Sequence, residues 1–127
     1  MTKDNEIIIL SNLPHTWLID IDGTILKHNG YILDGVDSVL PKVVEFFRSL
    51  PPKDVVILLT SRNIAYKEMT ECFLKKNNIR FNMIIYGLPF GERIVINDSK
   101  PSGMCTSVAC SIDRDQFNVK IEIDSSR

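Results

Sequence analysis

Trp17-Leu-Ile-Asp-Ile-Asp-Gly-Thr24 is the stretch of this chain that decides its interpretation. The apolar run 16–20 predicts a strand, and side chains two residues apart in a strand point to the same side, so Asp20 and Asp22 leave its end together. Gly23 allows the backbone to turn away at once. Such a pair suits a hard cation such as magnesium, or a reaction that needs a nucleophile beside a general acid and base. The alternative is an ordinary Asp-Gly turn with both acids solvated.

A phosphoryl group is the natural electrophile for such a pair, because a bound metal ion neutralises its oxygens. The run resembles motif I of the haloacid dehalogenase-like (HAD) superfamily, whose phosphatases carry a hydrophobic strand followed by D-x-D-G-T. The resemblance implies that Asp20 is the nucleophile that forms an aspartyl-phosphate. Asp22 would protonate the leaving group and later activate water, and its backbone carbonyl would bind magnesium. Gly23 is expected among the substrate-binding residues.

Composition predicts one globular domain over residues 1–127. The chain is 44% hydrophobic and 24% charged, with a formal net charge of -1, so nothing points to a nucleic acid or an acidic membrane surface as partner. Its apolar stretches are far shorter than the roughly 20 residues that cross a bilayer. The N-terminus lacks the long apolar centre of a secretion signal. The three cysteines have no C-x-x-C spacing, which favours reduced, mostly buried thiols. We therefore expect a cytoplasmic protein.

The order of apolar segments predicts strands that alternate with helices. A helix is expected over 36–50, or beginning only near Pro41, because proline fits the first turn of a helix but not its interior. Alternation of this kind predicts a mainly parallel α/β sheet with ligands at the carboxyl ends of the strands. Strands are expected at 16–20, 55–59, 81–86, 93–97, 105–112 and 118–123, with 7–10 a short strand or an irregular arm, and a second helix at 64–77.

A second polar cluster, Thr60-Ser61-Arg62, follows the apolar run 55–59 directly. A hydroxyl and free amides at that position can bind a phosphoryl oxygen. Alternatively, Thr60 or Ser61 caps the helix that follows. In the HAD pattern the matching motif II residue is Thr60, a catalytic and phosphate-binding position, and Ser61 could cap beside it. Arg62 is expected either to contact the substrate or to form a surface ion pair.

A third polar cluster, Asn97-Asp98, follows the apolar residues 94–96. Asp98 resembles the motif IV acid, which would complete a Mg2+ site formed with Asp20 and Asp22. Many relatives carry two acids at this motif, and Asn97 replaces the first here. Three carboxylates around one divalent ion leave a site whose charge an incoming phosphate dianion can balance.

The motif III cation is the part of the HAD pattern that the sequence matches least. Lys100 and Arg93 are the candidates. Lys100 is preferred because it lies just beyond Asp98, on the loop expected to face the site, where a cation offsets the carboxylates. The alternative is an exposed loop lysine, and Arg93 is expected at the far end of its strand.

The resemblance covers residues 16–115 and implies a three-layer, mainly parallel Rossmann-like HAD core without a cap domain. The segment 87–101 with Asp113-Arg114-Asp115 looks like small bacterial members encoded with surface-polysaccharide enzymes. A magnesium-dependent phosphatase acting on a phosphorylated sugar is therefore expected. Alternatives are a regulatory domain that binds metal or phosphate without catalysis, or a phosphatase of macromolecular substrates. Without a cap, a neighbouring subunit could act as lid through Tyr31, Ile32 and Leu33, although packing of this flap on its own domain is slightly favoured.

Overall fold

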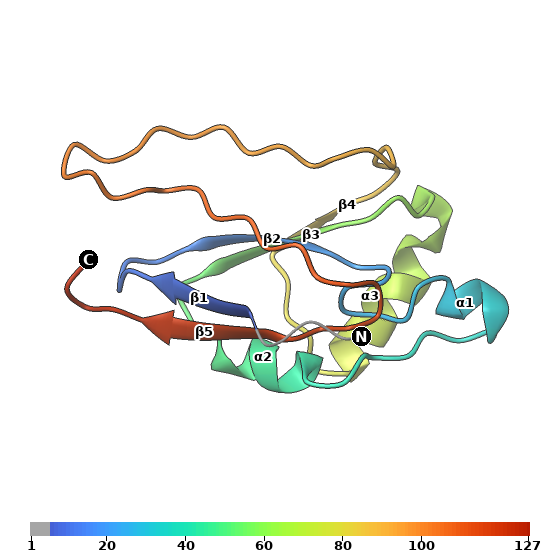
Figure 1. Ribbon diagram of the computed structural model, residues 1–127. Coiled ribbons are helices and arrows are strands. Elements are labelled where there is room, and N and C mark those ends of the chain that lie inside the picture. The colour runs from blue at the N-terminus through green and yellow to red at the C-terminus, as the bar shows by residue number, and fades with distance from the viewer. Residues whose placement is uncertain (1–5) are drawn as a thin grey trace.

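Two parallel β-sheets form the framework of the protein. The computed structural model describes residues 6–127, and residues 1–5, which bear on the secretion signal, lie outside that part. The larger sheet has the order β2-β3-β4, and the smaller pairs β1 with β5 (Figure 1). All pairs are parallel, so the predicted α/β class is confirmed. The strands are β1 (Glu6–Leu10), β2 (Thr16–Asp20), β3 (Val55–Leu59), β4 (Met83–Ile85) and β5 (Val119–Ile123).

The two strands predicted beside the site have the expected bounds, 16–20 and 55–59. Their β-branched and leucine-rich runs are typical of strands covered on both faces. Of the two alternatives for 7–10, the strand is correct, because it pairs with β5 in register from Glu6↔Val119 to Leu10↔Ile123. β4 is shorter than predicted, with three residues.

The helices are short, and proline sets the bounds of one of them. α2 (Val43–Ser49) begins after Pro41, as the second alternative predicted, and it ends before Pro51-Pro52. Leu50 is extended with ψ 131°, the conformation that a following proline favours. The predicted helix 64–77 consists of a 3-10 turn, η1 (Ile64–Tyr66), followed by α3 (Lys67–Lys76). The flap contains a short helix, α1 (Gly30–Leu33).

One hydrophobic core joins β2 and β3 to the helices. The Phe46 ring of α2 lies edge-on to Trp17 of β2, with ring centroids 5.5 Å apart, and to Phe117, at 5.0 Å. This packing fixes α2 against β2 and against the chain that enters β5. The fully buried apolar side chains are Ile21, Ile25, Leu26, Val43, Val56, Leu58, Leu74 and Ile79.

The predicted strands 93–97 and 105–112 are wrong. After β4 the amides of Gly87 and Leu88 bond to the carbonyls of Arg62 and Thr60, at 2.8 and 3.1 Å, so the chain crosses the end of β3. It then runs out and back as an extended excursion, residues 92–112, that turns at 101–103 (Figure 1). An apolar run without a neighbouring strand has no ladder to join.

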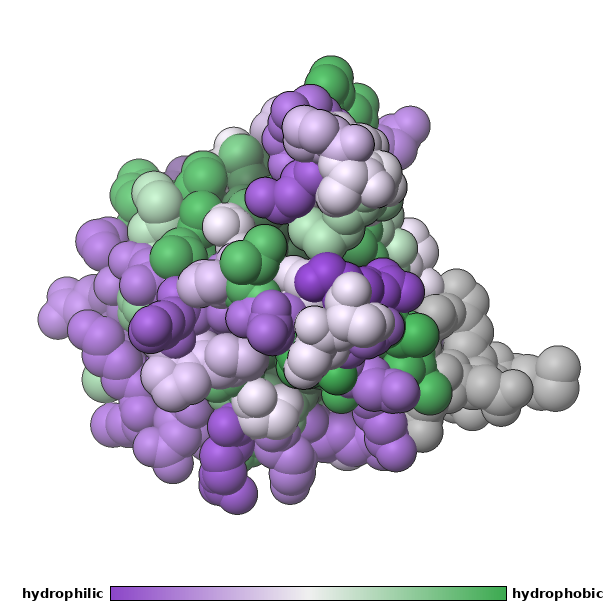
Figure 2. Space-filling view, turned by 90° about the vertical axis from the view of Figure 1, so that its left-hand side faces the viewer, coloured by the Kyte–Doolittle hydropathy of each residue, from purple (hydrophilic) through white to green (hydrophobic). Residues whose placement is uncertain are grey.

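The excursion leaves apolar side chains in solvent. Ile94 and Ile96 are 80% and 93% exposed. Figure 2 views the molecule from the side to which the excursion points, and its protruding upper part carries apolar surface. In the described part of the chain the cysteines form no disulfide, and all three are exposed, so the prediction of buried thiols is wrong.

Candidate active site at the end of strand β2

The chain turns tightly where β2 ends, and this turn presents two carboxylates. The Ile21 carbonyl accepts hydrogen bonds from the amides of residues 24–26, at 3.3, 3.1 and 3.0 Å. Gly23 has a φ of +83°, which a residue with a Cβ rarely adopts. The side chains of Asp20 and Asp22 are 31% and 16% exposed, so both keep access to solvent.

Asp22 is held by the polar cluster that follows β3. Its Oδ2 accepts a hydrogen bond from Thr60 Oγ1 at 3.0 Å. Its Oδ1 accepts from Arg62 Nη2 at 2.9 Å and from Arg62 Nε at 3.1 Å. Because β2 and β3 are parallel neighbours, their carboxyl ends meet at one edge of the sheet. The structure therefore brings together Asp22, Thr60 and Arg62, which sequence reasoning assigned to one site.

Arg62 is buried, with its side chain 1% exposed, and is not in a surface ion pair. Beyond Asp22, its guanidinium donates to both carboxylate oxygens of Asp37, at 2.7 and 3.1 Å, and to Thr70 Oγ1 at 2.9 Å. The Tyr31 ring covers it at 4.0 Å. Burial opposes its charge, but the two carboxylates outweigh burial and raise the pKa of Arg62. Every guanidinium N–H is used within the protein, which leaves none for a substrate.

Thr60 and Ser61 do not cap the following helix. The Asn63 side chain accepts from the Ala65 amide at 2.8 Å and so caps the η1 turn. The Thr60 hydroxyl donates to Asp22 and accepts from the Arg62 amide at 3.0 Å. Thr60 is fully buried and Ser61 is half-buried. The alternative in which Thr60 or Ser61 caps the helix is therefore wrong, and Thr60 serves the carboxylate site.

The cation beside Asp20 is Arg93 rather than Lys100. Arg93 Nη1 donates to Asp20 Oδ1 at 2.9 Å, while Thr24 Oγ1 donates to Asp20 Oδ2 at 3.0 Å. The expectation that Arg93 lies away from the site is therefore wrong. Lys100 lies at the start of the turn in the excursion, where its amide bonds to Met104. Figure 1 shows this turn at the opposite end of the molecule from the loop that follows β2.

The structure does not bring Asp98 to Asp20 and Asp22. Asp98 is exposed in the excursion, where its carbonyl accepts a hydrogen bond from the Thr106 hydroxyl. Among residues 6–127 no group of three or more His, Cys, Asp or Glu side chains could hold a metal ion. This corrects the expected placement of Asp98, and the reason is the path of the chain after β4.

Residues 113–115 lie against the turn after β2, a contact that sequence reasoning did not assign. The Asp115 amide donates to the Gly23 carbonyl at 2.7 Å, and Asp115 Oδ1 accepts from the His28 amide at 2.8 Å. A Cβ on Gly23 would lie 3.3 Å from Arg114 Cγ and 3.6 Å from His28 Nδ1. The sequence shows the charged run Asp113-Arg114-Asp115, but nothing in its spacing indicates which part of the chain it contacts.

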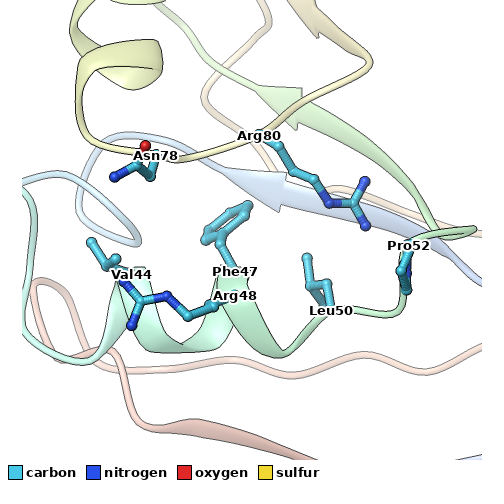
Figure 3. Close-up of a pocket in the computed structure, with 7 residues that line it drawn as sticks. All are labelled: Val44, Phe47, Arg48, Leu50, Pro52, Asn78 and Arg80. Atoms are coloured by element: carbon cyan, nitrogen blue, oxygen red, sulfur yellow. The ribbon is translucent and has the colours of Figure 1, made fainter.

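A cavity of about 440 Å³ lies beside α2 and shares no residue with this site. Figure 3 shows Phe47 and Leu50 on its apolar side, with Arg48 and Arg80 reaching it from α2 and from the chain before β4. Two Arg80 nitrogens bond to the carbonyls of Asp54 and Pro51, at 2.9 and 2.8 Å. This arginine therefore holds the backbone before β3.

Comparison of the chain with protein-family models, with curated proteins and with solved structures finds no match. Within residues 6–127, every helix is too short or too polar to span a membrane. The geometry at the end of β2 therefore carries the functional argument.

Proposed function

We propose that this protein is a HAD-type phosphomonoesterase of the cytoplasm that hydrolyses a phosphorylated sugar through an aspartyl-phosphate on Asp20. The observation that carries the proposal is the pair of partly exposed carboxylates at the carboxyl end of β2, with Thr60 bonded to Asp22. A parallel α/β sheet supports it, since such sheets bind ligands at this edge. We further infer that the three-stranded sheet is the centre of a capless three-layer HAD core.

The proposed reaction assigns separate roles to the two carboxylates. An oxygen of Asp20 attacks phosphorus, and the bond from phosphorus to the ester oxygen breaks as Asp22 gives a proton to that oxygen. A water molecule, deprotonated by Asp22, then attacks phosphorus and releases Asp20 and inorganic phosphate. Thr60 orients Asp22 through their hydrogen bond. Arg93 takes the role expected of Lys100, because it is the cation that contacts Asp20.

Magnesium dependence is part of the proposal, but the described residues do not fit a three-carboxylate centre. Asp20 and Asp22 offer the oxygen ligands that magnesium prefers. Both are paired with arginine, and Asp98 is not beside them. The assay below measures whether hydrolysis requires magnesium.

The flap beside the site bears on the proposed oligomer. Tyr31 packs on Arg62 and, edge-on, on Tyr66, with ring centroids 5.0 Å apart. Ile32 and Leu33 are 61% and 71% exposed. The expectation that the flap packs on its own domain is therefore correct for Tyr31 and wrong for Ile32 and Leu33. Exposed apolar side chains at this position support the proposal that a second subunit covers the flap.

The test is release of phosphate from an aryl phosphate and from a panel of sugar phosphates, with magnesium and with a chelator. We expect activity that requires magnesium and is abolished in Asp20→Asn. Asp124→Asn is the matched control, because it makes the same chemical change at an exposed carboxylate, 41% accessible, near the C-terminus. Retained activity in Asp20→Asn would exclude the aspartyl-phosphate.

A second candidate is a domain that binds phosphate or metal without turnover. The observation in its favour is that both carboxylates are already paired with arginine, Asp22 with Arg62 and Asp20 with Arg93. This candidate predicts a rise in melting temperature with magnesium and inorganic phosphate, and no hydrolysis across the panel, phosphopeptides included.

A further inference from the structure

The segment that returns from the excursion is fixed against the turn that presents Asp22. Asp115 adopts a left-handed conformation with φ +61° and bonds both to Gly23 and to the backbone of His28. Two residues later Phe117 is buried, with its ring centroid 5.0 Å from that of Phe46. Arg114 directly precedes these two anchors, so its backbone is held beside the turn.

Arg114 differs from the other two arginines of the site in its partners. Arg62 is buried between Asp22 and Asp37, and Arg93 pairs with Asp20. Arg114 is exposed, and its guanidinium has no hydrogen-bond or ion-pair partner among residues 6–127. Its stem contacts the position where Gly23 lacks a Cβ. Within the described residues, Arg114 is thus a cation beside this turn whose charge is not already matched.

A phosphate group that approaches two carboxylates needs such a cation. Its negative charge is repelled by Asp20 and Asp22, and an arginine already bonded to a carboxylate compensates less of that repulsion. A planar guanidinium also matches the geometry of phosphate oxygens and can donate two hydrogen bonds to them. Both sequence neighbours of Arg114 are acids, Asp113 and Asp115, and in the part of the chain that the structure describes neither forms an ion pair with it. Asp115 uses one oxygen to accept from the His28 amide.

We propose that Arg114 binds the phosphate group of the substrate and so determines the affinity of this site for phosphomonoesters. This rests on the proposed function, because it places the phosphate at the Asp20 and Asp22 turn. The lack of a Cβ at Gly23 allows the stem of Arg114 to lie close to the turn. Asp115 is a positioning residue, since it acts through the backbone of Gly23 and His28.

The first experiment is steady-state kinetics of Arg114→Ala and Arg114→Lys on the best substrate. Loss of a charge-assisted contact predicts a rise in KM of about tenfold to a hundredfold in Arg114→Ala, with a smaller change in kcat. Arg114→Lys keeps the charge and is expected to recover part of the affinity. Arg48→Ala, an exposed arginine on α2, is the control and should change neither constant. An unchanged KM in Arg114→Ala overturns the proposal.

A second measurement separates failure of this inference from failure of the proposed function. Binding of inorganic phosphate is measured by calorimetry for the wild type, Arg114→Ala and Arg48→Ala. Phosphate binding by the wild type that weakens at least tenfold only in Arg114→Ala supports the Arg114 site, even if no ester is hydrolysed. Absence of phosphate binding by the wild type, or equal binding in all three proteins, overturns it.

Discussion

Carboxylates and their hydrogen-bond donors lie at both ends of the strand pair β2 and β3, one carboxylate at the amino end and two at the carboxyl end, and the two groups differ in solvent exposure. At the amino end Asp54, whose side chain is 0% exposed, accepts from Trp17 Nε1 at 2.8 Å and from the His15 amide at 3.0 Å, and it pairs with His15 Nδ1 at 2.8 Å. We call these three residues the amino-end cluster. At the carboxyl end the side chains of Asp20 and Asp22 are 31% and 16% exposed to solvent.

The difference separates a structural carboxylate from chemically available ones. Asp54 is surrounded by its own donors, and the adjacent Val55 amide bonds to the His15 carbonyl at 2.9 Å, so this cluster fastens the start of β2 to the start of β3. Asp20 is held by one exposed arginine and one hydroxyl. Asp22 is intermediate in exposure between Asp54 and Asp20, and its partner Arg62 is buried.

The largest expected effect is that of Arg62→Met, which removes the buried cation from the carboxyl end. Asp37, 2% exposed, and Asp22 would then lack their partner, and leaving a buried charge uncompensated costs about 3 to 5 kcal/mol. We expect a loss of this size in the free energy of unfolding, measured by urea denaturation. Arg48→Met is the matched control. A loss in Arg62→Met no larger than in the control would mean that Asp22 and Asp37 are held by other contacts.

Asp54→Asn is the corresponding test of the amino-end cluster. The Asn side chain has one carbonyl oxygen with two lone pairs. It cannot accept from Trp17 Nε1, the His15 amide and His15 Nδ1 together. Loss of these charge-assisted bonds predicts a decrease of about 2 to 3 kcal/mol in the free energy of unfolding. Asp34→Asn, at a carboxylate 40% exposed, provides the control in the same denaturation series. Equal curves for the two variants would contradict a structural role for Asp54.

Sequence patterns predicted the two strands that carry the site. The runs 16–20 and 55–59 are continuous and apolar, so their strands and their parallel pairing followed, and with them the meeting of Asp22 and Thr60. The runs 93–97 and 105–112 also contain β-branched and apolar residues, yet they form no strand. Composition indicates that a segment can form a strand. Here the amides of Gly87 and Leu88 bond across the end of β3, so the chain that follows is directed away from the sheet.

The residues of the site also divide into those that the sequence predicted and those that depend on the path of the chain. Arg62 and Asp37 are joined although they are far apart in the sequence, and no spacing rule connects a residue between α1 and α2 to one that follows β3. The sequence predicts Arg93 at the far end of a strand and Lys100 on the loop that faces the site, whereas in the structure Arg93 contacts Asp20. Their distance from Asp20 depends on where the excursion begins and turns, which follows from the chain path after β4.

Low pH should reduce the difference in the free energy of unfolding between the wild type and Asp54→Asn. Burial opposes ionisation of Asp54, but hydrogen bonds from Trp17 and His15 outweigh burial and hold its pKa below the ordinary value of 3.8. A carboxyl with a lowered pKa stabilises the fold above its unfolded pKa, and this contribution is lost as the pH falls through the folded value. We therefore expect the stability difference between the two proteins to be full at pH 6 and to shrink below about pH 4. Urea denaturation from pH 6 to pH 3 measures it, and a constant difference would contradict the assignment.

The smallest stability effect is expected for Asp20→Asn, the variant with the largest proposed effect on catalysis. Asp20 and Arg93 are 31% and 36% exposed, and ion pairs of this kind contribute about 0 to 1 kcal/mol. The free energy of unfolding of Asp20→Asn should therefore lie within about 1 kcal/mol of the wild type. A loss comparable to that of Asp54→Asn would place Asp20 among the structural carboxylates. Retained stability together with lost phosphate release would instead show that the open end of the sheet keeps its carboxylates for chemistry rather than for folding.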